Sequence, residues 1–128
     1  MMEIITNFRN IGKIAKNIGK IKGVVAIYLF GSYAFGKQHN LSDIDLCIIG
    51  DLKEEDKIKI MGFSSDNLDI SFFDELPVWI QFRVFKNGKE LVGNKIEKLN
   101  LIKIFTLKKY LDFKPLINRL IEQRLENG

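Results

Sequence analysis

Two aspartates at the start of one apolar stretch are the residues of this sequence best suited to chemistry. Asp43 and Asp45 are separated by Ile44 and followed by the apolar run 46–49. Because side chains of a strand alternate between its two faces, both carboxylates are expected to point to the same side. Neighbouring carboxylates repel each other, and placing them on an apolar strand is costly unless a cation compensates them. Carboxylate oxygens are the ligands that Mg²⁺ or Mn²⁺ prefers, and they favour these ions over Zn²⁺.

A glycine–serine pair upstream supplies the second half of a nucleotide site. Gly31 and Ser32 directly follow the apolar stretch 24–30 and precede a short segment, 33–35, that fits a helical turn. Exposed backbone N–H groups at such a junction bind anions, and glycine lets a phosphate approach the backbone closely. The phosphate cradle and the carboxylate pair together predict a site for a nucleoside triphosphate. Two Mg²⁺ ions about 3.5–4 Å apart would stabilise the attacking and leaving oxygens of an in-line displacement.

Asp69 is the predicted third carboxylate of this site. It stands alone in the apolar run 68–73, and it is a candidate metal ligand and the candidate base for an attacking hydroxyl. The alternative is a structural carboxylate that backbone donors satisfy. Likewise, Asp43 and Asp45 alone would fit a solvated strand entrance, and Gly31-Ser32 alone would fit an ordinary turn.

The hydrophobic pattern predicts the elements that position these residues. Apolar residues at steps of three and four predict an amphipathic helix near the N-terminus, with Lys13, Lys16 and Lys20 on its solvated face. The continuous β-branched run 24–30 is typical of a strand covered on both sides. The pattern as a whole predicts an α/β (α+β) protein with a small mixed β-sheet flanked by helices, in a single domain over 1–128. The expected elements are helix 8–21, strands 24–30, 43–49 and 68–73, a helix or turn 53–61, helix 74–85 capped by Asp74, edge strand 90–92, and two C-terminal helices, 95–110 and 114–125, within about 95 to 126.

The motif GSYAFGKQHNLSDIDL resembles the signature of the DNA polymerase β-like nucleotidyltransferase superfamily. Its Gly31-Ser32, ten-residue spacer and Asp43-Ile44-Asp45-Leu46 are similar to the smallest members, the minimal nucleotidyltransferases (MNT). The segment LDISFFDELP, where the family places its third carboxylate, and the C-terminal YLDFKPLINRLIEQRL extend the resemblance over most of the chain. The resemblance implies the polymerase β-like nucleotidyltransferase fold, with Asp43, Asp45 and Asp69 as metal ligands and catalytic residues and Gly31 and Ser32 as nucleotide-binding residues.

The resemblance also implies a biological role. MNT proteins commonly act as antitoxins of type VII toxin–antitoxin pairs, beside a HEPN-domain toxin that is typically an RNase. In such pairs the antitoxin transfers AMP from ATP to a tyrosine of the toxin, so the resemblance implies an Mg²⁺-dependent protein adenylyltransferase. One position departs from the family, which often has Arg where this chain has Phe35. Two alternatives stay open: an antitoxin that neutralises by binding alone, and a nucleotidyltransferase acting on a small molecule or an RNA end.

Composition narrows the class of protein. The 128 residues are 46% hydrophobic and 28% charged, which is typical of a globular domain. The net charge of +4 suits an anionic ligand such as a nucleotide, and the scarcity of Arg relative to Lys disfavours a nucleic-acid reader. The one cysteine, Cys47, lies in an apolar run and is interpreted as a buried residue. With no signal-peptide pattern and no apolar run near the roughly 20 residues of a membrane span, we expect a cytoplasmic protein without a membrane partner.

Three aromatic residues after Pro77, namely Trp79, Phe82 and Phe85, are interpreted as core. Arg83 on the same expected helix is a weaker candidate for a phosphate contact. The apolar faces of the C-terminal helices are expected to pack on the sheet, and any apolar surface left exposed there is the candidate contact for a partner protein.

Overall fold

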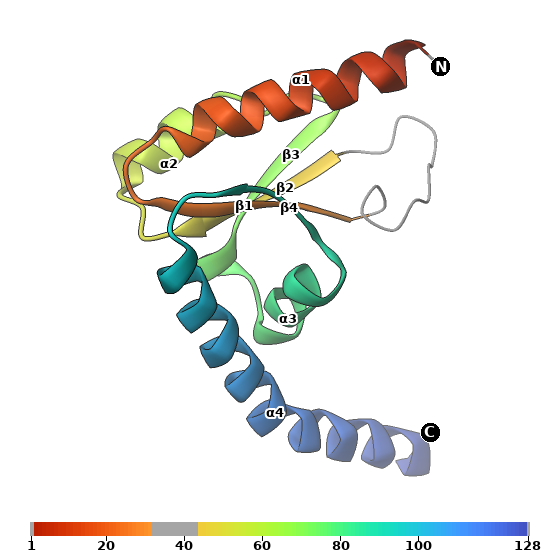
Figure 1. Ribbon diagram of the computed structural model, residues 1–128. Helices are drawn as coiled ribbons and strands as arrows, with labels where there is room; N and C mark the ends of the chain where they lie inside the picture. Colours follow the sequence, from red (N-terminus) through yellow and green to blue (C-terminus); the bar gives the residue numbers. More distant parts are fainter. Residues whose placement is uncertain (1, 32–43, 128) are drawn as a thin grey trace.

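The predicted mixed sheet with flanking helices is confirmed in a computed structural model of the chain (Figure 1). The structure describes residues 2–31 and 44–127, and the side chains of residues 10–31 and 44–125. A four-stranded sheet has the order β3-β2-β1-β4, with β2 and β3 parallel and the other neighbours antiparallel. The strands are β1 (Val24–Phe30), β2 (Ile44–Gly50), β3 (Leu68–Phe72) and β4 (Lys89–Gly93), and the helices are α1 (Met2–Gly19), α2 (Glu54–Met61), the 3-10 turn η1 (Phe73–Glu75), α3 (Val78–Asn87) and α4 (Ile96–Asn127).

One face of the sheet is covered by α1 and α2 (Figure 1). Ile18 of α1 and Ile60 of α2 are fully buried there against apolar side chains of the strands. Lys13, Lys16 and Lys20 are exposed, as predicted for the solvated side of the first helix. This face is a closed apolar layer, and its burial is a main source of the stability of the domain.

The other face carries α3 and the start of α4 (Figure 1). Val84 of α3 and Leu99 of α4 are buried against strand residues that include Tyr28 and Cys47. The strand residues alternate between the two layers: Leu46 and its alternate neighbours contact the first, whereas Cys47 and its alternate neighbours contact the second. The prediction that β1 is covered on both sides is confirmed.

The segment after β3 differs from the expected helix 74–85. The strand ends at Phe72, a 3-10 turn occupies Phe73–Glu75, and α3 begins only at Val78 with Pro77 as its N-cap residue. Asp74 therefore does not cap the helix, and that prediction is wrong. Proline disfavours helix in the residue before it, so Leu76 is not helical, and Pro77 itself is the extended N-cap residue that precedes the first helical residue, Val78.

The expected pair of C-terminal helices is a single helix. α4 runs from Ile96 to Asn127 and includes Pro115, which was predicted to separate two helices. In Figure 1 this helix changes direction partway along its length, and proline inside a helix commonly causes such a bend. Only the start of α4 packs on the sheet, through Leu99 and Ile102, so the prediction that the whole C-terminal segment does so is wrong.

No described helix is long and apolar enough to cross a lipid bilayer.

Candidate active site

Asp45 and Asp69 lie side by side on the sheet. They are Cα partners in the parallel pairing of β2 with β3, and neighbouring strands lie roughly 4.8 Å apart. Alternation along each strand places both on the face that carries α3 and α4, because their sequence neighbours on both strands pack into the opposite layer. Asp45 is half-buried and Asp69 is exposed. Two predicted site carboxylates therefore lie on one face at the start of two adjacent strands.

Gly31 completes this edge of the sheet from β1. Phe30 pairs with Asp45, and the chain leaves the strand at Gly31 with a φ of +92°, a conformation that residues other than glycine rarely adopt. A Cβ at this position would collide with the carboxylate of Asp45. Glycine is thus required twice, for the turn and for the close approach of the Asp45 carboxylate to the backbone.

Several predicted site residues lie outside the described part of the chain. Asp43 and Ser32 belong to the range 32–43, as does Phe35. The roles of these residues, and the expectation that Asp43 and Asp45 share a face, remain predictions.

Farther along the same face, the pKa values of two buried side chains, Cys47 and Tyr28, are raised. Burial raises the pKa of the Cys47 thiol to about 12, although a hydrogen bond with Ser71 opposes the shift. Burial also raises the pKa of Tyr28 to about 12, and Glu90, which accepts a hydrogen bond from the Tyr28 hydroxyl at 3.1 Å, adds to the shift. Cys47 is fully buried, as predicted, and with so high a pKa it does not supply a nucleophile at neutral pH.

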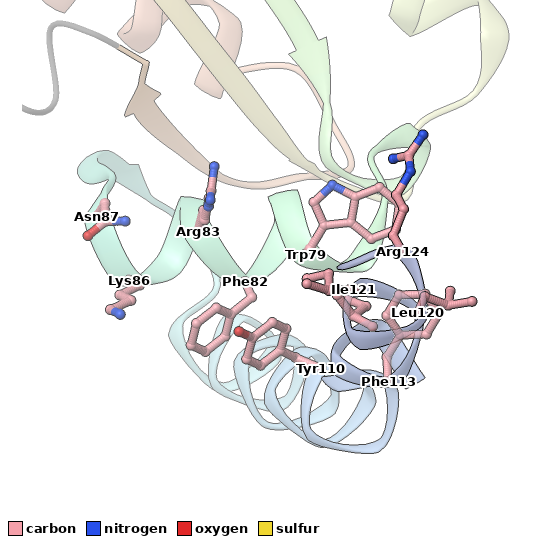
Figure 2. Close-up of a pocket in the computed structure, with 11 residues that line it drawn as sticks. Trp79, Phe82, Arg83, Lys86, Asn87, Tyr110, Phe113, Leu120, Ile121 and Arg124 are labelled. Carbon is pink, nitrogen blue, oxygen red and sulfur yellow. The ribbon is translucent and has the colours of Figure 1, made fainter. Parts of the chain in front are cut away.

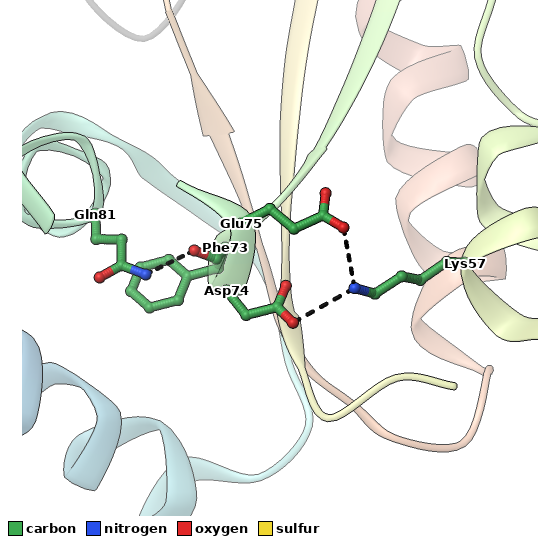
Figure 3. A network of polar contacts seen from close by, with 5 residues as sticks. All are labelled: Lys57, Phe73, Asp74, Glu75 and Gln81. Carbon is green, nitrogen blue, oxygen red and sulfur yellow. Dashed lines mark hydrogen bonds and ion pairs between the residues drawn. The ribbon is translucent and has the colours of Figure 1, made fainter. Parts of the chain in front are cut away.

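A basic side chain of α2 is engaged at the opposite end of β3 (Figure 3). The Lys57 ammonium lies 3.4 Å from a carboxylate oxygen of Asp74 and 3.2 Å from one of Glu75, and the pKa of Lys57 is raised, chiefly by its hydrogen bond to Glu75. Beside this network, the Gln81 amide donates a 2.7 Å hydrogen bond to the carbonyl of Phe73. Because Asp69 is at the start of β3 and this network follows its end, Lys57 serves to join α2 to η1.

A groove between α3 and α4 was not predicted from the sequence (Figure 2). It has a volume of about 840 Å³ and is lined by aromatic, apolar and basic side chains, including Arg83. Trp79 lines it and is 44% exposed, so its interpretation as core is wrong, whereas Phe85 does pack against the core. Apolar residues that line the groove recur in the sequence at helical spacing. That spacing identifies an apolar face of a helix but does not say which other element covers it.

The chemistry of the carboxylates fits a divalent cation. Asp45 and Asp69 present hard oxygen donors on one face, and Gly31 lets the Asp45 carboxylate approach the backbone closely. Within residues 2–31 and 44–127, no group of three or more His, Cys, Asp or Glu side chains is arranged to hold a metal ion. The predicted third ligand, Asp43, falls in the gap between these ranges. Two of the three predicted ligands thus lie side by side on the sheet, and Mg²⁺ binding by them remains a prediction.

Known proteins share this sequence pattern and fold. A segment of 74 residues, 58% of this chain, is 36% identical to "Putative protein adenylyltransferase MJ1547" of Methanocaldococcus jannaschii, and it covers 60% of that protein's length. A crystal structure of a toxin–antitoxin with AMP-PNP superposes with a TM-score of 0.71 at 23% identity, over 89% of this chain and 98% of that one. An MNT antitoxin solved with a tri-AMPylated Shewanella oneidensis HEPN toxin gives 0.66 at 21% identity, over 98% and 99% of the two chains. At these identities the structural likeness establishes a common fold.

A family comparison covers all four strands of the sheet. The model of the family described as polymerase beta, nucleotidyltransferase, matches residues 11–97, which include Gly31, Asp45 and Asp69. This match agrees with the superfamily predicted from the glycine–serine turn and the paired aspartates. The chain belongs to the polymerase β nucleotidyltransferase family.

Proposed function

We propose that this chain is an Mg²⁺-dependent protein adenylyltransferase that transfers AMP from ATP to a tyrosine of a HEPN-domain toxin. In this role it would be the antitoxin of a type VII toxin–antitoxin pair. The observation that carries the proposal is the pairing of Asp45 with Asp69 on adjacent strands, beside the turn at Gly31. The relative named as an adenylyltransferase and the folds solved with AMP-PNP and with an AMPylated HEPN toxin support the nucleotide and the acceptor.

The proposed roles rest on the family signature and, for Gly31, Asp45 and Asp69, also on their positions in the sheet. Asp45, with Asp43, would hold Mg²⁺, which supplies charge stabilisation to the phosphates when bound. The backbone at Gly31 and Ser32 would bind phosphate oxygens. The tyrosine oxygen would attack the α-phosphorus of ATP, forming a new P–O bond while the bond to pyrophosphate breaks. Asp69, which is exposed and adjacent to Asp45, would accept the phenol proton.

Transfer of label from ATP tests this function. The chain is incubated with α-labelled ATP, Mg²⁺ and the HEPN toxin of the same genome, and labelled toxin is measured on a denaturing gel. We expect labelling by the wild type and a loss of about a hundredfold or more for Asp45→Asn, since the loss of a metal ligand removes charge stabilisation worth several kcal/mol in the transition state. Equal labelling by wild type and Asp45→Asn would contradict the assignment of the site.

Two other functions give different results in the same assay. An antitoxin that acts by binding alone would neutralise the toxin fully as Asp45→Asn and transfer no label. An enzyme for a small molecule or an RNA end would label that acceptor and leave the toxin unlabelled. Asp69→Asn provides a further comparison, because loss of the proposed base should lower kcat while ATP still binds.

A further inference from the structure

The groove between α3 and the distal part of α4, residues 110–125, is open and rich in anchor side chains (Figure 2). Trp79 and Tyr110 line it from opposite helices, together with Arg83 and Arg124. Trp, Tyr and Arg are the residue types that most often dominate the binding energy of protein interfaces. Leu120 and Ile121, which also line it, are 56% and 52% exposed. This much apolar surface on one groove is typical of a contact site.

The charges of the groove select the kind of occupant. Its basic residues are Arg83, Lys86 and Arg124, and none of the residues that line it, all from the described part of the chain, is acidic. An occupant with carboxylates along its edge is therefore complementary to the rim. The apolar floor between these cations requires, in addition, apolar side chains on the occupant.

The arrangement of the aromatic rings favours a protein over a nucleic acid. Phe82 stacks on Tyr110 with ring centroids 3.9 Å apart, and Trp79 stacks on Phe113 at 5.8 Å. Rings that already stack on each other across the two helices offer less free surface to bases, whereas single-strand binding uses aromatic faces left open for stacking. An amphipathic helix laid along a groove between two helices uses instead the apolar edges and the charged rim.

One end of the groove lies near the end of β1 that leads to Gly31. Lys86 and Asn87, at the end of α3, line the groove and precede Gly88. A Cβ on Gly88 would lie 3.2 Å from the carbonyl oxygen of Leu29, two residues before Gly31. α3 packs on the face of the sheet that carries the carboxylate pair, and its last turn, at one end of the groove, lies near the end of β1 where Phe30 pairs with Asp45.

We infer that this groove docks an acidic amphipathic helix of the protein substrate and so presents the acceptor hydroxyl to the carboxylate edge. This inference rests on the proposed function, and it names the surface and the chemistry that select the substrate. The binding energy of the groove would position the acceptor hydroxyl against the bound nucleotide. Such positioning accelerates a reaction most when two separate substrates must be brought together.

The test compares two double variants of the full chain. Trp79→Ala/Arg124→Glu removes one anchor and reverses one charge in the groove. Leu111→Ala/Lys16→Glu makes the same kinds of change at exposed positions that do not line it. Binding of the HEPN toxin is measured by calorimetry, and binding of ATP with Mg²⁺ is measured separately as a check of the fold. We expect the groove variant to bind toxin at least about tenfold more weakly and the control to change by less than about twofold.

The outcomes distinguish a failure of docking in the groove from a failure of AMP transfer. A raised KM for toxin in the groove variant, with the control unchanged, supports the inference. Equal toxin affinity in wild type and groove variant overturns it, and labelling of the toxin by both would leave the proposed transfer intact. If the toxin binds through the groove without being labelled, the docking surface stands and the proposed transfer fails. Tight binding of a single-stranded RNA 20-mer by the wild type, lost only in the groove variant, would also overturn the inference.

Discussion

The two faces of the sheet are built from the same strands but differ in what they expose. The face under α1 and α2 is a closed layer of aliphatic side chains, with Leu46 and Ile48 of β2 fully buried in it. The face under α3 and α4 also has a buried layer, but two carboxylates lie at its edge and the two helices that cover it enclose an open aromatic groove between them. Residues one position apart on β2 therefore belong to regions with different tasks. The two buried layers supply stability, so the edge of the second face can carry carboxylates that are costly to hold together.

Neighbouring substitutions on β2 give the sharpest contrast. Ile48→Ala should lower the free energy of unfolding by about 2–5 kcal/mol, because it leaves a cavity in the closed layer. Asp45→Asn should leave stability nearly unchanged while abolishing AMP transfer. Urea unfolding and the labelled-ATP assay measure the two effects. A large loss of stability in Asp45→Asn would show that this carboxylate is a structural residue, which would break the division between the faces.

Alanine substitutions at Gly31 and Gly12 should change the stability of the protein in opposite directions. Gly31→Ala forces a positive φ on a residue with a Cβ and pushes against the Asp45 carboxylate, so it should cost about 1–3 kcal/mol of stability. Gly12→Ala lies in α1, where the added Cβ meets nothing within 4 Å, and it should stabilise the protein by about 0.5–1 kcal/mol. Thermal unfolding measures both. An equal response of the two variants would count against the close approach at Gly31.

Alkaline pH should weaken the second face. The pKa of Cys47 is about 12 in the folded chain and lower when unfolded, so the folded state binds more protons between these values. Stability is then complete below the unfolded pKa and falls as pH rises toward 12, by at most about 1.4 kcal/mol per pH unit for this group. Urea midpoints across pH 8 to about 11 test the slope, which should become shallower in Cys47→Ala. An unchanged slope in that variant would assign the alkaline loss to other groups, such as Tyr28.

The smallest effect on stability is expected at Lys57, which joins α2 to η1. Lys57→Gln removes the contacts of α2 with Asp74 and Glu75, which are themselves exposed. Exposed ion pairs contribute little and are screened by salt, so the melting temperature should fall slightly at low salt and match the wild type at about 1 M NaCl. A deficit that persists at high salt would point to the lost packing of the lysine on the Phe72 ring, where its ammonium lies 5.1 Å from the centroid.

The parts of the fold that follow from local pattern were predictable. The run 24–30 is apolar throughout and forms the strand covered on both faces, and Lys89–Gly93 forms the expected edge strand. The family could be predicted because the glycine–serine turn and the paired aspartates have a characteristic spacing. What sequence alone could not provide was register: nothing in the run 68–73 says that Asp69 pairs with Asp45 rather than with a neighbour.

The errors concern contacts between distant elements. Trp79 has the spacing of a core residue, but its indole lies beside Phe113, more than thirty positions later in the chain. Pro115 suggested a break, yet α4 continues through it, because the loss of one backbone hydrogen bond can be absorbed by a bend. In both cases tertiary packing, which a single sequence does not reveal, determined the outcome.

The stacked pair of Trp79 and Phe113 has a practical consequence. Trp79 is the only tryptophan of the chain, so the ultraviolet-excited emission of the free protein comes chiefly from one indole that is 44% exposed to water. A molecule that covers this indole should shift its emission to shorter wavelength, whereas a ligand bound only near Gly31 and Asp45 should leave the spectrum almost unchanged. The protein therefore carries a built-in optical label that distinguishes, in one titration, events on the long helix from events at the sheet edge.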